Sequence, residues 1–522
     1  MGKSEIEMNG TNDLSHNVIE ISEADRQLCG NVAISIGKML KQLPHVNEES
    51  SIYRVPKQLH DMNPKAYDPQ LISIGPYHHF TRKDLIATEQ YKLQGLINFL
   101  RRINNNKMES LEDLLKIGTL KALVEKAHCW VKEARNCYAA HINMKEEEFV
   151  MMMLVDACFI VEFFILYYDQ GHPDCRFSQI QHNVDLSFYK GIVFHIFYDL
   201  TKLENQVPFF LLRSLFHLIP EDDVPMISFI DDEDGPISFT QLTYNVLNFG
   251  FMGKYEICCE LLEEPAHLVD FLIYFLFVPL PPGMKNRQHE KSNENNNDFS
   301  SLLRFLLPAH WKKQNEDQNS EKKKNKKPHD ENNMEKQWVP PSITELCEAG
   351  VTIKKAENTK CLMNISFKNG VLEIPPLFIT DSFEIIMRNL IAFEHFSTES
   401  KNKYVIQYVS FLDYLICSDK DVSLLVKADI IINDIGGSDI EVSQLFNNLC
   451  KFVAVPSYSS HFNNISKDLV EHYNGWWNKS KASLKHNYFN TPWAFISFFA
   501  ATLLIILTLL QTIFSAISAF PT

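Results

Sequence analysis

Residues 150–168 read VMMMLVDACFIVEFFILYY, an almost unbroken apolar run of helical length. Two acids, Asp156 and Glu162, interrupt the run. A charged side chain at the centre of a bilayer costs about 2.5–3.5 kcal/mol on insertion scales, so two acids disfavour a membrane span. We therefore predict that this run is a helix buried inside a folded body.

The composition of the whole chain agrees with a large globular body. The chain has 522 residues, of which 45% are hydrophobic and 37 are Phe. This length suits one large or two medium domains with thick aromatic packing. The formal net charge of −15 disfavours nucleic acid as a partner, because phosphate contacts need clustered Lys and Arg.

Local signals in the second half favour helices. Ser342 and Glu345 fit a capping box, and Gly350 follows where such a helix would stop. Asp381 and Glu384 repeat the pattern with Asp381 as the expected N-cap. The residues after Asp381 carry apolar side chains at the spacing of one helix face.

One hairpin stands out between these two helices. The stretches CLMNISF (361–367) and VLEIPPL (371–377) flank Asn369-Gly370, a pair that suits a type I′ turn. The predicted fold class is therefore mainly α: a large helical body with a few short β-hairpins, plus one C-terminal transmembrane helix.

The charge and hydropathy pattern predicts the organisation of the chain. Residues 1–45 form a polar N-terminal segment, and residues 46–478 form the body. The body is interrupted at 312–337, a stretch with almost no apolar content that is typical of a flexible insert. Residues 493–520 carry no charge and form the predicted transmembrane anchor.

The residues beside the anchor predict its orientation. A helix over 493–520 would span about 40 Å, enough to cross about 30 Å of hydrocarbon with some tilt. No basic or aromatic residue follows the span. Several precede it: Trp476, Trp477, Lys479, Lys481, Lys485 and Tyr488. The positive-inside rule then places the body in the cytosol, as in a tail-anchored protein of the plasma membrane or an endomembrane. Four N-x-S/T sequons, at Asn9, Asn364, Asn464 and Asn478, are expected to stay unmodified there.

The residues that might carry chemistry form no strong catalytic signature. GxGxxG, P-loop, HExxH and GxSxG patterns are all missing from the sequence. His78 and His79 could bind metal or move protons, but no Cys or acid lies nearby at ligand spacing. Asp156 and Glu162 are open to either a structural or a catalytic role. No cofactor and no metal are expected.

A polar island lies in DLTKLENQVPFFLL, at 199–212. Pro208 at the first position of a helix would bring Glu204 or Asn205 near orphan N–H groups at the helix start. We therefore predict that the island is a structural network. A catalytic role for Glu204 is the alternative.

Eight distinctive runs occur along the chain ahead of the C-terminal span: IYRVPKQL (from Ile52), AYDPQLISIGPYHH (from Ala66), TEQYK (from Thr88), VDACFIVEFF (from Val155), DLTKLENQVPFFLL (from Asp199), SITELCEAGV (from Ser342), FKNGVLEIPPL (from Phe367) and RNLIAFE (from Arg388). Taken together and in this order, these runs and the span resemble the plant domain-of-unknown-function 247 (DUF 247) family, over about residues 50–515. Departures are small: Ala157 stands where the family usually has Gly, Thr88 stands where it often has Met, and Thr201-Lys202 replaces part of a leucine run.

This resemblance implies a plant protein with a single-pass anchor and brings no active site with it. Links of some members to pollen recognition, growth or stress suggest recognition or signalling. The expected function is therefore a membrane-tethered interaction protein, more in keeping with binding a protein partner than with catalysis. The alternative is an enzyme of unrecognised class, in plant specialised metabolism, with an acid- and His-lined pocket in the helical body.

Overall fold

The computed structural model describes residues 23–41, 50–79, 83–104, 117–171, 192–227, 235–251, 264–278, 337–357, 361–396, 403–453, 461–475 and 492–519. The predicted insert 312–337 lies outside these ranges except for Gln337, and so do the residues expected to flank the anchor. The chain divides into two units, 1–48 and 49–522. The described part of the first unit is one helix, α1 (Glu23–Lys41).

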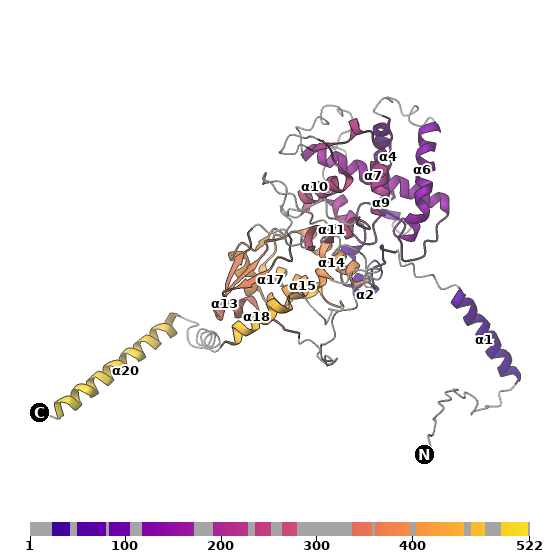
Figure 1. Ribbon diagram of the computed structural model, residues 1–522. Coiled ribbons are helices and arrows are strands. Elements are labelled where there is room, and N and C mark those ends of the chain that lie inside the picture. Colours follow the sequence, from indigo (N-terminus) through magenta and orange to yellow (C-terminus); the bar gives the residue numbers. More distant parts are fainter. Residues whose placement is uncertain are drawn as a thin grey trace, which may run out of the picture. The chain divides into compact units, whose positions relative to one another are not determined.

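Helices dominate the second unit, as the sequence predicted (Figure 1). Its described helices are α2 (Lys57–Met62), α3 (Pro64–Tyr67), α4 (Glu89–Ile103), α6 (Ile117–Asn136), α7 (Glu146–Gly171), α8 (Val193–Leu200), α9 (Phe209–Phe216), α10 (Phe239–Phe251), α11 (Leu268–Phe277), α13 (Ile343–Glu348), α14 (Asp381–Phe396), α15 (Tyr404–Leu415), α16 (Asp419–Lys427), α17 (Asp439–Leu449), α18 (Asn463–Asn474) and α20 (Pro492–Ala519), with short 3-10 turns η1 (Lys83–Thr88) and η4 (Glu221–Asp223).

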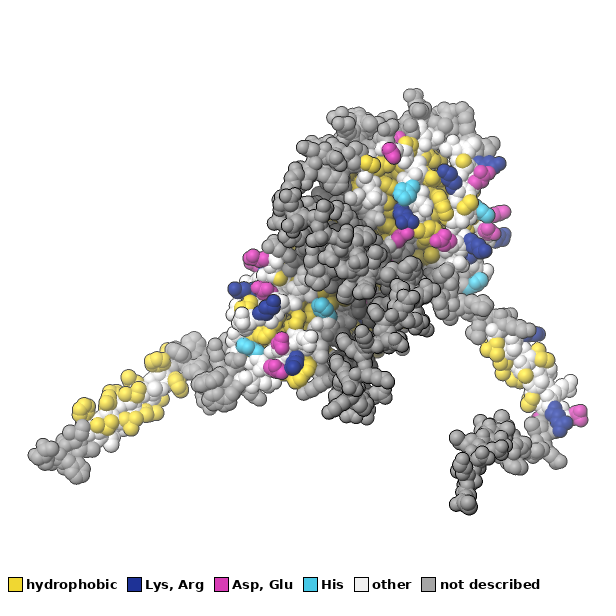
Figure 2. Space-filling view, viewed as in Figure 1, with side chains coloured by type: hydrophobic (Ala, Val, Ile, Leu, Met, Phe, Trp, Pro, Cys, Tyr) yellow, Lys and Arg dark blue, Asp and Glu magenta, His cyan; other side chains and the backbone are white. Residues whose placement is uncertain are grey.

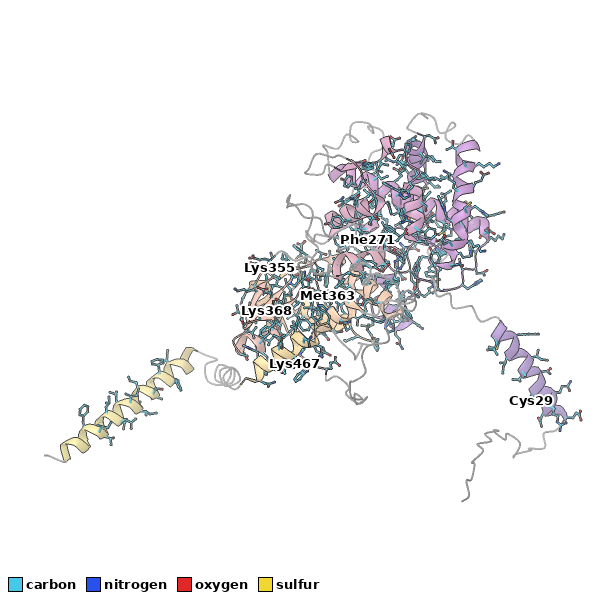
Figure 3. All side chains as sticks on the ribbon, viewed as in Figure 1. Cys29, Phe271, Lys355, Met363, Lys368 and Lys467 are labelled. Carbon is cyan, nitrogen blue, oxygen red and sulfur yellow. The ribbon has the colours of Figure 1, made fainter. Side chains whose placement is uncertain are left out.

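Helix α7 is the centre of the N-terminal half of the body. It packs against α4, α6, α9 and α10, and 89% of its apolar window, Glu146–Asp169, is buried. Gly95 lets α4 come close, because a Cβ at that position would lie 2.8 Å from the Cα of Phe159. The prediction of a buried helix over 150–168 is therefore confirmed. Phe271 of α11, labelled in Figure 3, is another fully buried aromatic of this body.

The strands are short and belong to the later part of the body except for β1 (Met226–Ile227) and β2 (Gly235–Pro236). The predicted hairpin is confirmed: β4 (Ser366–Lys368) pairs antiparallel with β5 (Val371–Ile374). Asn369 and Gly370 have φ of 53° and 75°, the positive values that a type I′ turn requires.

Two strand pairs are parallel, which the sequence did not predict. Strand β5 pairs in parallel with β3 (Thr352–Lys355), and β6 (Leu377–Ile379) pairs in parallel with β7 (Ile431–Asn433). Pro375 and Pro376 separate β5 from β6, since proline offers no N–H to a ladder. Lys355 and Lys368, labelled in Figure 3, end β3 and β4.

The two predicted helix starts have different outcomes. Ser342 and Glu345 form the capping box at the head of α13, with side chain and backbone bonded in both directions. The expectation that Asp381 is an N-cap is wrong, because Asp381 is itself the first residue of α14. The Thr380 carbonyl instead accepts the Phe383 N–H, so the backbone turn before the helix takes the place of the expected cap.

Helix α20 matches the predicted anchor. Its segment Ile496–Ser515 has a mean hydropathy of 2.2, none of it buried, and is long and apolar enough to cross a membrane. Figure 2 shows this helix covered by hydrophobic side chains with neither basic nor acidic ones among them.

Candidate functional site

Helix α4 supplies a cation for each of the two buried acids of α7, Asp156 and Glu162. The Lys92 Nζ lies 2.9 Å from the Asp156 Oδ1 and 2.8 Å from the Glu89 Oε1. Both members of the Lys92–Asp156 pair are almost fully buried. Burial by itself lowers the pKa of Lys92, but the two carboxylates outweigh it and raise that pKa. Asp156 is therefore the counter-ion of a buried ammonium.

Glu162 forms a two-pronged ion pair with Arg102. The Arg102 Nε donates to Oε1 at 2.7 Å and Nη2 donates to Oε2 at 3.0 Å. Both side chains are 1% exposed. Such a pair stabilises the body only while both partners are present, because either charge alone would be buried without a counter-ion. Glu162 is thus fully engaged by one guanidinium.

Three side chains together hold the backbone of residues 70–75. The Asp199 carboxylate accepts the N–H groups of residues 70, 71 and 72 at 2.6–2.9 Å. The Asn205 Oδ1 accepts the Ile74 N–H at 2.7 Å, and the Asp156 Oδ2 accepts the Gly75 N–H at 2.8 Å. Acids and an amide from two distant segments thereby replace the regular hydrogen bonds that this loop lacks.

Asn205 also ties its own segment to the loop. Its Nδ2 donates to the carbonyls of Ile72 and Asp199, both at 3.0 Å. Asn205, Ile72 and Asp199 are all fully buried. Lys202 completes this part of the network by donating to the Asp199 Oδ1 at 2.9 Å and to the Asp68 carbonyl.

Glu204 holds a second segment, at residues 54–55. Its Oε1 accepts the Val55 N–H at 2.7 Å, and its Oε2 accepts from the Arg54 Nη1 at 2.7 Å. The His78 Nε2 lies 3.5 Å from the same Oε2. Arg54 is half exposed and stacks over the Tyr77 ring at 4.1 Å. This cluster of Arg54, Tyr77, His78 and Glu204 is the most accessible part of the network.

Two further residues close the network around the loop. The Gln206 Nε2 donates to the carbonyls of Leu200, Lys202 and Asn205. The Gln206 carbonyl accepts from the Tyr138 hydroxyl at 2.9 Å. Gly75 has φ of +69°, and a Cβ there would lie 2.5 Å from the same carbonyl oxygen, so only glycine fits.

The polar island has a different structural role from the predicted capping of a helix. Helix α9 begins at Phe209, with Pro208 as the preceding cap residue and no side-chain cap. The Phe209 N–H donates to the Ala266 carbonyl instead. The expected capping of this helix by Glu204 or Asn205 is therefore wrong. Glu204 instead accepts the backbone N–H of Val55, and Asn205 accepts that of Ile74. Both partners are distant in sequence and could not be identified from local spacing.

The six candidate residues do not converge on one point. Asp156, Asn205 and Glu204 hold neighbouring parts of the 52–79 segment, and His78 approaches Glu204, but Glu162 faces Arg102. His79, next to His78 in the chain, is half-buried. Within the described ranges, no group of three His, Cys, Asp or Glu side chains is placed to bind a metal.

Several residues that bind the candidate residues or their segments were not predicted from the sequence. Lys92 and Arg102 lie in the amphipathic helix α4, and Lys202 follows the end of α8, so no local pattern distinguishes these buried cations from exposed ones. Asn389 of α14 accepts the Leu203 N–H at 2.9 Å and donates to the Ala66 carbonyl at 2.9 Å. It therefore links α14 to the polar island and to α3.

Buried Glu394 and His267 also hold backbone. The Glu394 carboxylate accepts the first two N–H groups after Tyr404 at 2.9 Å, and burial raises its pKa to about 7. His267 caps α11 by accepting the Asp270 N–H and bonds the Ser51 carbonyl through Nε2. Burial lowers its pKa to about 4, so the neutral ring with hydrogen on Nε2 fits both contacts.

Comparison with known proteins finds relatives that cover most of the chain. The chain is 27% identical over 488 residues to UPF0481 protein At3g47200 of Arabidopsis thaliana, covering 90% of this chain and 87% of the relative. It is 22% identical over 552 residues to the putative UPF0481 protein At3g02645 of the same plant, covering 94% of each. No solved structure matches the chain. The family described as plant protein of unknown function, DUF247, matches residues 52–507, and the chain belongs to this family.

Proposed function

We propose that the chain is a membrane-tethered interaction protein whose body faces the cytosol and binds a protein partner. The observation that carries the proposal is the exposed apolar segment Ile496–Ser515, which is long enough to span a bilayer. An apolar surface of this size is unfavourable in water unless lipid or protein covers it. A single helix of this kind would hold the whole body at one membrane surface.

The use of the buried polar groups supports a role other than catalysis. Backbone N–H groups donate hydrogen bonds to side-chain oxygens of four of these residues: Asp156, Asp199, Glu204 and Asn205. A general acid or base needs a free path to substrate and a proton it can exchange. Groups that fix the 52–75 backbone serve to make the body rigid, which suits a surface that recognises a partner.

The test of the tether is removal of residues 490–522. The full chain should remain in carbonate-washed membranes, and the truncated chain should appear in the soluble fraction. Truncated protein that stays in the washed membranes would contradict the tether.

The orientation has its own test in two sequons. Asn364 and Asn464 are both exposed on the described body, so an oligosaccharyltransferase in a lumen could reach them. A cytosolic body predicts no change in gel mobility after endoglycosidase treatment. A mobility change that Asn364→Gln and Asn464→Gln abolish would place the body in the lumen.

The enzyme alternative is favoured by one cluster. His78 and Arg54 meet at the Glu204 Oε2, and Arg54 is half exposed. A carboxylate beside an imidazole could exchange protons with a bound molecule. Glu204→Gln discriminates between the two functions. An unchanged melting temperature with loss of the cellular phenotype would favour the enzyme, whereas earlier melting and lower abundance would favour the structural role.

A further inference from the structure

The side-chain amide of Gln511 is the most polar group of α20. Three threonines on this helix satisfy their hydroxyls internally: Thr502 donates to the Phe498 carbonyl at 2.8 Å, Thr512 donates to the Thr508 carbonyl at 2.7 Å, and Thr508 bonds one turn back in the same way. Gln511 has no such contact with any residue that the structure describes.

Gln511 lies within Ile496–Ser515, the segment long and apolar enough to span the bilayer. An amide in hydrocarbon has no water to bond, and each unsatisfied group there costs several kcal/mol. Its two donors and its acceptor therefore need a partner from outside the helix. The chemistry that satisfies both kinds of group at once is another carboxamide or a similar polar side chain.

Gln511 lies at the edge of a stripe of small residues on α20, and the larger Leu504, Leu507 and Phe514 lie beside it on the helix. At 3.6 residues per turn, one stripe carries Ser497, Ala501, Thr508, Thr512 and Ser515. The other sides carry large residues such as Phe498, Ile506, Leu510 and Ile513. Small side chains allow two membrane helices to approach closely, which brings a polar side chain within reach of its partner.

We propose that Gln511 pairs two copies of this chain, side-chain amide to side-chain amide, across the stripe of small residues on α20. The inference rests on the proposed membrane tether. A second copy fits because two parallel α20 helices place their Gln511 residues at the same depth, and a carboxamide is self-complementary. The contact is then isologous, with each amide donating to the other.

The experiment uses the full chain labelled with donor or acceptor fluorophores at its N-terminus, in phosphatidylcholine vesicles at a series of protein-to-lipid ratios. The variants are Gln511→Leu, which removes the amide, and Gln511→Asn, which keeps it. Ile513→Leu is the matched control, because it changes a residue of similar size on another side of the same helix. Carbonate washing of every sample reports insertion separately from pairing.

The parent and Ile513→Leu should show the same energy transfer, rising with protein density. Gln511→Leu should weaken the association roughly 3- to 30-fold, the range for one interhelical hydrogen-bond pair, and Gln511→Asn should lose less. Parent protein that inserts but shows no transfer above the random level overturns the pairing and leaves the tether intact. Transfer that is equal in the parent and Gln511→Leu also overturns it. Protein missing from the washed membranes overturns the tether and the pairing together.

Discussion

Helices α7 and α20 are nearly equal in hydropathy and opposite in surroundings. The apolar window of α7, Glu146–Asp169, has a mean hydropathy of 2.4 and is 89% buried, whereas Ile496–Ser515 of α20 has 2.2 and is not buried at all. Length and apolarity therefore do not separate a core helix from a membrane-spanning one. The difference lies in the charges.

Helix α7 has two fully buried acids, whereas α20 has no acid. Asp156 and Glu162 are held by Lys92 and Arg102 of α4, so the body supplies the counter-ions that lipid would not. In α20 three threonine hydroxyls bond carbonyls of their own helix, and the one carboxamide is that of Gln511. Charges with built partners mark a helix that belongs inside protein.

The strongest way to break this comparison is to remove one buried charge of α7. Glu162→Leu would keep the Arg102 guanidinium buried without the carboxylate that binds it at two points, at an expected cost of about 3–5 kcal/mol. Since domains are stable by only about 5–15 kcal/mol, the body should accumulate poorly and melt far earlier. Melting curves and protein levels measure the effect. The double variant Glu162→Leu with Arg102→Met should recover most of the loss, and failure to recover would show that the pair does more than neutralise itself.

A charge placed in α20 should act on the membrane and not on the fold. Leu507 is 53% exposed on the helix, and lysine near the centre of a span costs about 2.5–3.5 kcal/mol on insertion scales. Leu507→Lys should therefore lower the fraction recovered in washed membranes while the body melts at the parent temperature. Leu507→Ile serves as the control. A lower melting temperature for Leu507→Lys would mean that α20 packs on the body.

A third apolar helix, α11, extends the comparison to pH. His267 at its start has a pKa of about 4 in the fold against an ordinary 6.5. The unfolded chain binds a proton there at higher pH than the folded chain does, so this contribution to stability is full above about 6.5 and is lost as pH falls towards 4. The loss amounts to as much as about 3 kcal/mol.

The measurement is the free energy of unfolding at a series of pH values, in the parent and in His267→Gln. The difference between the two should shrink between pH 6.5 and pH 4, because only the parent loses the neutral imidazole. Glu394, whose pKa is raised to about 7 by burial, favours the folded state in the opposite direction, as pH falls, and is common to both proteins. A pH-independent difference would contradict the neutral, buried imidazole.

The smallest expected effect tests the loop that both α7 and the polar island hold. Asn205→Ala removes the acceptor of the buried Ile74 N–H, at an expected cost of about 1–3 kcal/mol. The variant should melt earlier and accumulate less. Asn464→Ala, on an exposed residue, is the control and should change neither. Equal melting of Asn205→Ala and the parent would mean that another group or water takes over the bond.

The sequence alone determined what depends on neighbouring residues. The Asn-Gly turn needs two positive φ values, and Asn369 and Gly370 supply them whatever the rest of the chain does. The capping box at Ser342 is likewise closed within three residues. The two acids of 150–168 were enough to predict burial, because a bilayer would not accept them.

Only the tertiary structure decided where the buried polar atoms point. Local spacing placed Glu204 and Asn205 at the start of α9, yet they bind backbone about 149 and 131 residues earlier in the chain. Likewise, Arg102 finds Glu162 across 60 residues. A buried polar group must be satisfied, which the sequence makes certain, but which atom satisfies it depends on the segments that the fold brings within 3 Å.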